Sequence, residues 1–262
     1  MVSDMPHAQL NGVNLYYERI GSGEPIILLT GFAGDSGFWR RASEMLSSEF
    51  DVITIDNRGA GRTQYGGDFT MDDLSKDVIS LLDHLDLMDV NIVGWSMGSH
   101  IAMGTVLVPN QRIRTLTLIS SYLFRPARSD YILTSLLDSI QNGAPVKDLA
   151  LVLNCMLHTE DFFERMKEEN KIIRLPDLKD PKGLRYQLNA VNLSDITDDV
   201  SKISIPTLVI HGDKDIMVEQ QEGIKVANKI PESELMIIEG EGHLIPADLY
   251  VPQMINFIKQ HS

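Results

Sequence analysis

The feature that most constrains this chain is a series of short apolar runs, rich in β-branched residues, that recur between longer segments with helical spacing. Two of these runs, Ile26 to Leu29 and Leu208 to Ile210, are apolar without alternation, which is typical of strands that helices cover on both faces. Strands that alternate with helices build parallel sheets. The sequence therefore predicts an α/β protein with a mostly parallel central sheet of about eight strands and flanking helices.

Six of the expected strands follow one another along the chain, and two more lie near its start. The six are Ile26 to Leu29, Asp51 to Ile55, Val90 to Val93, Thr115 to Ile119, Thr207 to His211 and Leu235 to Ile238. The first two, around Ala8 to Asn11 and Asn14 to Arg19, are joined by Asn11-Gly12, which suits a tight hairpin turn. An amphipathic helix is expected from Met71 to Leu87.

An insertion interrupts the strands, because more than eighty residues without a strand signal separate Ser120 from Thr207. Helical spacing is present in Tyr131 to Ile140, Val146 to Leu157 and Asp161 to Glu169, and Asp180-Pro181 is interpreted as a break. No repeat or low-complexity linker separates this region from the rest. We therefore predict one core made of residues 1–122 and 201–262, with residues 123–200 inserted as a helical cap over the sheet.

Composition excludes several classes of protein. With 23 Lys and Arg against 37 Asp and Glu, the net charge is -14, so a nucleic-acid partner bound through a basic face is not expected. No run approaches the roughly 18 apolar residues of a membrane helix, and Met1 to Leu10 lacks the pattern of a secretory signal. The single cysteine, Cys155, cannot form an internal disulfide and is expected to be buried. These observations predict a soluble, cytoplasmic protein without a membrane partner.

A five-residue motif carries the first sign of chemistry. Gly94-Trp95-Ser96-Met97-Gly98 fits the pattern G-x-S-x-G, directly after an expected strand and before a helical stretch from Ser99 to Leu107. Such a sharp turn strains its central residue, and the two glycines leave room for it, so an exposed Ser96 hydroxyl is predicted. The backbone N–H of Met97 would then lie at a helix N-terminus, where it can bind a developing oxyanion.

A serine hydroxyl is a weak nucleophile near neutral pH, so it requires a histidine that accepts its proton and a carboxylate that orients this histidine. Two later strands are followed by such residues, one by Asp213 and Asp215 and the next by His243. The carboxyl ends of parallel strands meet at one edge of a sheet. The order Ser96, Asp215, His243 predicts these three as catalytic residues, with Asp213 as a turn residue that caps its own backbone.

Four ordered segments together resemble the α/β-hydrolase superfamily, of the small serine-hydrolase kind with a helical cap, over nearly the whole chain. Besides the serine motif, they are Leu29-Thr30-Gly31-Phe32-Ala33-Gly34 with Trp39, Asp56-Asn57-Arg58-Gly59-Ala60-Gly61-Arg62-Thr63, Pro206-Thr207-Leu208-Val209-Ile210-His211-Gly212 with Asp215 and Val218, and Gly242-His243 with Pro246. The resemblance implies that the backbone N–H of Phe32 is a second oxyanion donor beside Met97, and that neither metal nor cofactor is needed. Thr30 stands where the family most often has histidine, so we expect altered hydrogen bonding in that loop.

The layout is similar to that of 3-oxoadipate enol-lactonases and carboxylesterases. The resemblance therefore implies hydrolysis of a carboxylic ester, thioester or lactone of a small substrate through an acyl-serine intermediate. Ser96 argues against haloalkane dehalogenases and epoxide hydrolases, whose nucleophile is aspartate. The alternatives are an enol-lactonase or carbon–carbon bond hydrolase acting on a carboxylated substrate, a cofactor-free perhydrolase and, from another class, a small-molecule receptor.

Three residues are candidates for substrate binding: Trp95, Arg125 and Arg128. The predicted cap is rich in apolar side chains, which favours a neutral acyl group. The two arginines follow the strand that ends near Ser120, and either guanidinium could bind a substrate carboxylate. The net charge of -14 favours the alternative, in which both arginines are solvated or pair with acidic residues. The acyl and alcohol groups and the oligomeric state are left open by the sequence.

Overall fold

The computed structural model describes residues 7–109, 112–171, 178 and 180–261. Its eight strands form one sheet in the order β1-β2-β4-β3-β5-β6-β7-β8, in which β2 runs antiparallel to β1 and β4 and the other neighbours are parallel. The strands are β1 (His7–Leu10), β2 (Val13–Gly21), β3 (Glu24–Leu29), β4 (Phe50–Ile55), β5 (Val90–Trp95), β6 (Ile113–Ile119), β7 (Thr207–Gly212) and β8 (Ser233–Ile238). The predicted fold class is confirmed.

The hairpin turn between β1 and β2 follows the expected chemistry. Asn11 and Gly12 have φ angles of 44° and 78°, so both take the left-handed conformation that a two-residue turn of this hand requires. The expected amphipathic helix is α2, which spans Met71–His84 and is therefore shorter than predicted. Thr70 and Asp73 form a capping box at its start.

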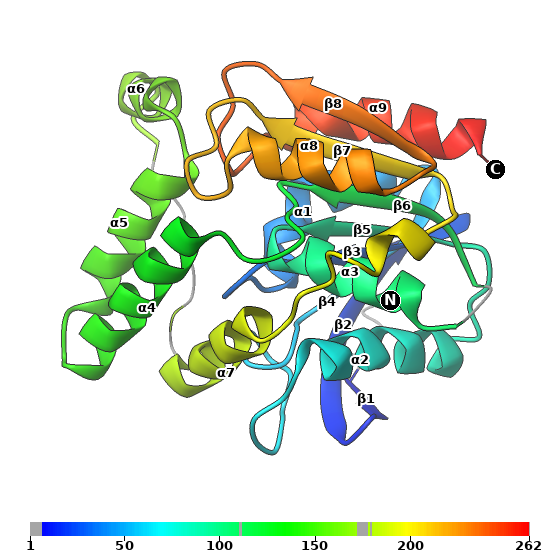
Figure 1. Cartoon of the computed structure of the whole chain (residues 1–262), viewed down its shortest axis with the longest axis horizontal. Helices are drawn as coiled ribbons and strands as arrows, with labels where there is room; N and C mark the ends of the chain where they lie inside the picture. Colours follow the sequence, from blue (N-terminus) through cyan, green and yellow to red (C-terminus); the bar gives the residue numbers. More distant parts are fainter. Residues whose placement is uncertain (1–6, 110–111, 172–177, 179, 262) are drawn as a thin grey trace.

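Helices cover both faces of the sheet (Figure 1). One face carries α1 (Arg40–Leu46) and α9 (Ala247–Gln260), and the other carries α2, α3 (Met97–Leu107) and α8 (Gln220–Lys229). Successive residues of β3 alternate between the two hydrophobic clusters, with Ile26 and Leu28 in one and Ile27 and Leu29 in the other. This two-sided burial is why β3 is apolar without alternation.

Four helices of the insertion follow β6 and precede β7 along the chain, and they lie to the side of the sheet in Figure 1. They are α4 (Ala127–Gln141), α5 (Val146–Leu157), α6 (Glu160–Glu168) and α7 (Pro181–Asn192). The predicted break at Asp180-Pro181 is confirmed, because the pair marks the start of α7: the Asp180 side chain accepts a hydrogen bond from the Gly183 N–H and Pro181 occupies the first turn of the helix. The predicted cap boundaries, 123–200, remain a prediction, and part of that range (172–177 and 179) lies outside the described residues.

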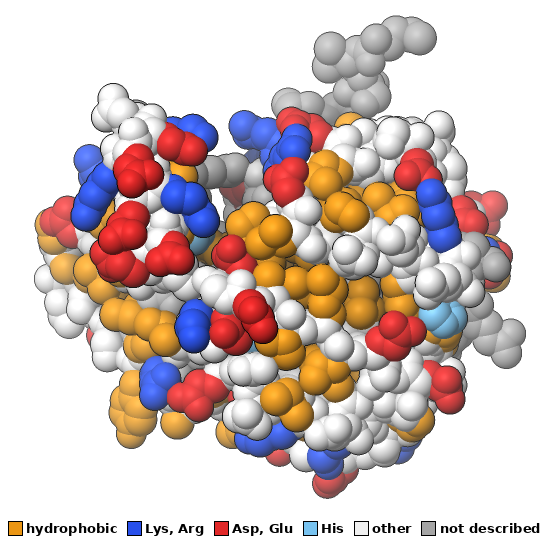
Figure 2. Space-filling model, turned by 90° about the horizontal axis from the view of Figure 1, so that it is seen from above, with side chains coloured by type: hydrophobic (Ala, Val, Ile, Leu, Met, Phe, Trp, Pro, Cys, Tyr) orange, Lys and Arg blue, Asp and Glu red, His pale blue; other side chains and the backbone are white. Residues whose placement is uncertain are grey.

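Within the described part of the chain, the connections include two short 3₁₀ helices, at Ser36–Trp39 and Val200–Lys202. Cys155 is exposed, so its predicted burial is wrong: it lies on the outer side of α5 beside Leu151 and Val152, which are also exposed. None of the described helices is long and apolar enough to cross a membrane. Acidic and basic side chains are interspersed on the face in Figure 2, where the described side chains form no basic stripe.

Candidate active site

Ser96 occupies the turn between β5 and α3 in a strained backbone conformation, with φ 55° and ψ -120°. The glycines two residues to either side make this turn possible. A Cβ on Gly94 would lie 2.3 Å from the carbonyl oxygen of Gly98, and a Cβ on Gly98 would lie 2.1 Å from that of Leu29. The turn therefore packs backbone against backbone and presents the Ser96 side chain at the carboxyl edge of the sheet.

Ser96 meets a histidine and a carboxylate that follow two other strands. The Ser96 Oγ lies 2.9 Å from Nε2 of His243, and Nδ1 of His243 lies 2.7 Å from Oδ2 of Asp215. His243 follows β8 and is 3% exposed, and Asp215 follows β7 and is 5% exposed. These three side chains, distant in sequence, thus form one hydrogen-bonded chain in which His243 and Asp215 are buried and Ser96 is partly exposed.

The environment of Asp215 keeps it ionised. Burial alone raises the pKa of this carboxyl, but the charges and hydrogen bonds of His243 and His211 outweigh burial and hold the pKa well below its usual range. Oδ1 accepts hydrogen bonds from the backbone N–H groups of Met217 and Val218, at 2.9 and 2.8 Å. Asp215 is therefore a fixed anion that faces the imidazole of His243.

Asp213 has a different place. Its Oδ1 accepts a 2.7 Å hydrogen bond from the backbone N–H of Gly240, and its Oδ2 lies 3.4 Å from Lys214 Nζ. The expected cap on its own backbone is thus replaced by a bond to the loop that precedes His243. Asp213 joins two loops, while Asp215 contacts the imidazole.

Phe32 and Met97 line the same small cavity as Ser96 and His243. Within the described part of the chain, neither of their backbone N–H groups has a hydrogen-bond partner. Thr30 stabilises the loop before Phe32 by donating from Oγ1 to the carbonyl oxygen of Gly34 at 3.0 Å, and its own carbonyl oxygen accepts from Asn57 Nδ2 at the same distance. Two free N–H donors beside a serine hydroxyl can bind the oxygen of a carbonyl under attack.

The cavity has a volume of about 30 Å³, which leaves room for a short chain and little more. Besides the residues already described, its walls are formed by Tyr122, Arg125, Ser129, Leu133, Val191, Met217 and Val218. Most of these come from the segment after β6, the insertion and the Asp215 loop. The insertion therefore helps to determine what can reach Ser96.

The three candidate substrate-binding residues have three different places. Trp95 is buried in the core, where its ring stacks on Phe38 with centroids 4.5 Å apart, and it is not among the residues lining the cavity. Arg128 is exposed, and its guanidinium pairs with Glu219 at 2.9 Å, outside the cavity. Arg125 is buried and lines the cavity with Ser96.

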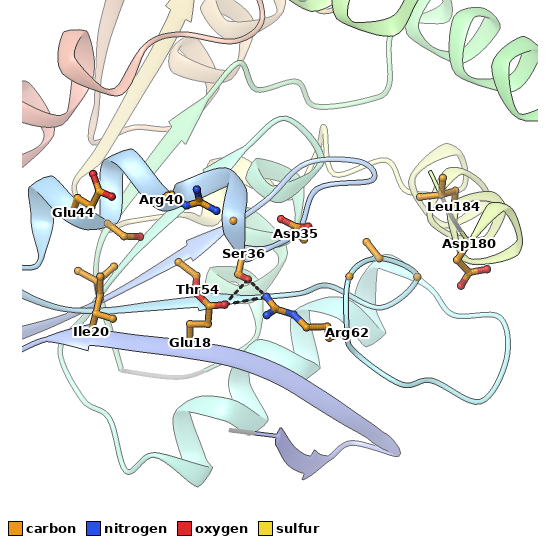
Figure 3. Close-up of a pocket in the computed structure, with 16 residues that line it drawn as sticks. Glu18, Ile20, Asp35, Ser36, Arg40, Glu44, Thr54, Arg62, Asp180 and Leu184 are labelled. Atoms are coloured by element: carbon orange, nitrogen blue, oxygen red, sulfur yellow. Dashed lines mark hydrogen bonds and ion pairs between the residues drawn. The ribbon is translucent and has the colours of Figure 1, made fainter. Parts of the chain in front are cut away.

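A larger pocket of about 740 Å³ contains none of the three triad side chains (Figure 3). It lies beside β2, β4 and the turn at Ser36, where Arg62 and Glu18 bond to each other. Arg62 bonds to Ser36 Oγ at 2.6 Å and to Glu18 at 3.0 Å. The small cavity, and not this pocket, contains Ser96 and His243.

Three further residues near the site carry no signal strong enough to be found in the sequence. His211, at the end of β7, lies 2.9 Å from the Val218 carbonyl oxygen and 3.3 Å from Asp215 Oδ2 through the same Nε2. Gln187 of α7 is buried and accepts from the Ala33 N–H at 3.0 Å, which fixes the loop that carries Phe32.

The third residue is His158, at the end of α5. It stacks on Phe162 with ring centroids 3.6 Å apart, and burial, with a smaller effect from His243, lowers its pKa to about 4. His158 is therefore neutral near pH 7 and adds no charge close to His243. Among the described residues, no group of three or more His, Cys, Asp or Glu side chains could hold a metal ion.

A mostly parallel α/β sheet with a serine, a histidine and an aspartate gathered at its carboxyl edge defines a class of proteins built around a nucleophilic elbow. The chain belongs to the alpha/beta hydrolase fold family, whose model matches residues 24–248.

Three known proteins illustrate the range of its relatives. The chain is 27% identical to a non-heme chloroperoxidase of Kitasatospora aureofaciens, over 91% of this chain and 92% of that protein. It is 25% identical to a thermophilic esterase of Thermogutta terrifontis solved with malate bound, with a TM-score of 0.87 and coverage of 98% and 100%. It is 22% identical to an enol-lactonase of Burkholderia xenovorans, with a TM-score of 0.85 and coverage of 97% and 100%, a likeness of fold.

Proposed function

We propose that this protein is a serine hydrolase that cleaves a carboxylic ester, thioester or lactone of a small substrate through an acyl-Ser96 intermediate. The observation that carries the proposal is the hydrogen-bonded chain from Ser96 Oγ through His243 to Asp215, with separations of 2.9 and 2.7 Å. Both distances lie within the range required for proton transfer from a nucleophile to its base.

The proposed reaction begins when Ser96 Oγ attacks the substrate carbonyl carbon and His243 Nε2 takes the hydroxyl proton. Asp215 holds Nδ1–H of His243, so Nε2 is free to act as the base, and it stabilises the imidazolium that forms. The oxyanion accepts hydrogen bonds from the backbone N–H groups of Phe32 and Met97. The imidazolium then donates its proton to the leaving oxygen or sulfur, which departs and leaves the acyl group on Ser96.

Deacylation repeats these steps with water in place of Ser96. His243 takes a proton from the water, hydroxide adds to the acyl carbon, and the carboxylic acid leaves as Ser96 regains its proton. The relatives support a second candidate, since one is a non-heme chloroperoxidase. If hydrogen peroxide replaces water as the acceptor, the acyl group leaves as a peracid, so perhydrolysis needs the same residues and only a different acceptor.

The test compares native protein with Ser96→Ala on p-nitrophenyl acetate and on a panel of metabolite esters and thioesters followed by mass spectrometry. Alanine is smaller than serine, so the variant should fold, and activity should fall by several powers of ten. A fluorophosphonate probe should label the native protein at Ser96. A variant that retains more than about a tenth of the native rate on its best ester would refute the acyl-serine mechanism.

The same assay separates the enzyme from a receptor, the alternative of another class. A receptor would bind small molecules with no turnover that depends on Ser96. Addition of hydrogen peroxide during ester hydrolysis, with detection of peracid, measures the perhydrolase candidate. Peracid formation at a rate far below hydrolysis would reject it.

A further inference from the structure

Arg125 is a buried cation without an anionic partner among the residues that the structure describes. The residue is 6% exposed, and its printed hydrogen bond runs from Nη2 to the backbone carbonyl oxygen of Ser129, at 3.1 Å. A guanidinium has five N–H donors and stays charged, so one carbonyl acceptor leaves most of its hydrogen-bonding capacity unused. Burying such a group is unfavourable unless a negative charge accompanies it.

Other arginines that are partly or largely buried do have a carboxylate partner. Arg58 donates to Asp77 at 2.6 Å, and Arg19 donates to Asp51 at 2.5 Å. Within the described part of the chain, no carboxylate lies within 4 Å of the Arg125 guanidinium. Asp130 is close enough to act on Arg125 through its charge, but its Oδ1 already accepts from Asn192 at 2.7 Å and from Thr134 at 3.2 Å. The unpaired cation is therefore particular to this place in the fold.

Arg125 shares a cavity with the reacting groups. Its side chain lines the volume of about 30 Å³ that also contains Ser96, His243 and the backbone donors at Phe32 and Met97. Because those donors would hold the acyl carbonyl oxygen, the acyl group is the part of the substrate that occupies this cavity. A negative charge on the acyl group would thus lie next to the guanidinium.

We propose that Arg125 binds a carboxylate carried by the acyl group, so that the preferred substrate is a short half-ester or lactone of a dicarboxylic acid. This inference rests on the proposed function of Ser96 as the acylated nucleophile. The small cavity limits the chain between the two carbonyl carbons to a few atoms. From the sequence we expected a neutral acyl group, with both arginines either solvated or paired with acidic residues. Arg128 does pair with Glu219. Arg125 does not fit that expectation, and the inference replaces the neutral acyl group by a charged one.

The net charge of -14 does not oppose this preference. Exposed charges are screened beyond about 8 Å at physiological salt, whereas a contact with a buried group such as Arg125 is screened much less. A planar guanidinium also binds a carboxylate through two parallel hydrogen bonds, which a point charge cannot do. The local cation therefore decides which acyl groups are favoured at Ser96.

The kinetic test measures kcat/KM for monomethyl succinate and dimethyl succinate, which differ in one methyl group and one charge. The native protein should prefer the half-ester by about 10- to 100-fold. Arg125→Met should lower the ratio of the two kcat/KM values by the same factor, and Arg125→Lys should restore part of it. Arg185→Met is the control, because Arg185 lies on α7 and pairs with Asp138, and its ratio should match the native one.

An equal ratio in native protein and Arg125→Met would overturn the inference, and so would a native preference for the diester. Neither result would contradict the proposed function, because both can be obtained only if the protein hydrolyses esters. If no ester is hydrolysed, the proposed function fails, and binding decides the inference instead. Succinate should bind the Ser96→Ala protein at least about 10-fold more tightly than it binds Ser96→Ala/Arg125→Met in calorimetry. Equal affinities would overturn it, and thermal unfolding verifies that both proteins are folded.

Discussion

The indole N–H of Trp95 donates a 2.9 Å hydrogen bond to the backbone carbonyl oxygen of His243. The same oxygen accepts a second bond from Ser120 Oγ, at 3.0 Å. Trp95 directly precedes Ser96, so the end of β5 that carries the proposed nucleophile also holds the loop that carries the proposed base, His243. Trp95, expected from the sequence to bind substrate, thus connects the two partners from within the core.

Replacing Trp95 by phenylalanine keeps an aromatic ring in the core but removes the N–H that holds His243. We expect kcat to fall about 10-fold with a smaller change in KM, because the loss of one buried hydrogen bond loosens the base without touching the substrate. Trp39→Phe is the matched control, since Trp39 is also buried and its Nε1 has no hydrogen-bond partner among the described residues. Steady-state kinetics measure kcat and KM of both variants, and equal losses of kcat would contradict a positioning role for Trp95.

Asp215 and Asp213 lie two residues apart and should respond differently to loss of charge. Asp215→Asn removes the anion that faces His243 Nδ1, and we expect kcat to fall by about three to four powers of ten. Asp213→Asn retains an oxygen that can accept from Gly240, so its kcat should change by less than about 10-fold. The reverse ranking in steady-state kinetics would transfer the acid role to Asp213.

The serine turn could be predicted from the sequence because its constraint is local. A central residue with positive φ between a strand and a helix needs small neighbours, and Gly94 and Gly98 supply them at fixed spacing. His243 and Asp215 could be placed because parallel strands bring their carboxyl ends to one edge. In each case the geometry of the backbone, a sharp turn or the end of a parallel strand, fixes where the residue lies.

Burial was harder to predict from the sequence where it depends on packing between distant segments. Cys155 has apolar neighbours in the sequence, but Leu151 and Val152 are exposed with it on α5. Arg125 bonds to Ser129 of the adjacent α4, which is a local contact, but it also lines a cavity with Met217 and Val218 of the Asp215 loop, about ninety residues away, and its own sequence gives no sign of that neighbourhood.

A methyl group at Gly98 tests how tightly the serine turn packs. Gly98→Ala would place its Cβ 2.1 Å from the Leu29 carbonyl oxygen, and the backbone there cannot yield as a flexible side chain would. We expect the free energy of unfolding to fall by about 3 kcal/mol or more. Gly66→Ala, whose Cβ would meet open space, should change it by less than about 1 kcal/mol. Urea unfolding measures both, and similar values for the two variants would contradict the close packing of the turn.

His100 on α3 should make the fold sensitive to acid. Burial lowers its pKa to about 4, with a smaller opposing effect from Asp195, whereas an unfolded histidine titrates near 6.5. Between these two values the unfolded chain binds a proton that the folded protein does not, so stability is present above about pH 6.5 and is lost as the pH falls. A shift of this size corresponds to about 3 kcal/mol once the pH is below about 4.

His100→Gln keeps a donor that can bond to Ser194, whose Oγ lies 2.9 Å from Nε2 of the imidazole, but it cannot titrate in this range. The free energy of unfolding of this variant should therefore vary less between pH 6.5 and 4 than that of the native protein. The difference between the two slopes against pH should correspond to the uptake of about one proton on unfolding. His84→Gln, at an exposed site near the end of α2, is the control and should follow the native curve. The measurement is urea unfolding at half-unit steps of pH, and a His100→Gln curve parallel to the native one would show that His100 is not the group responsible.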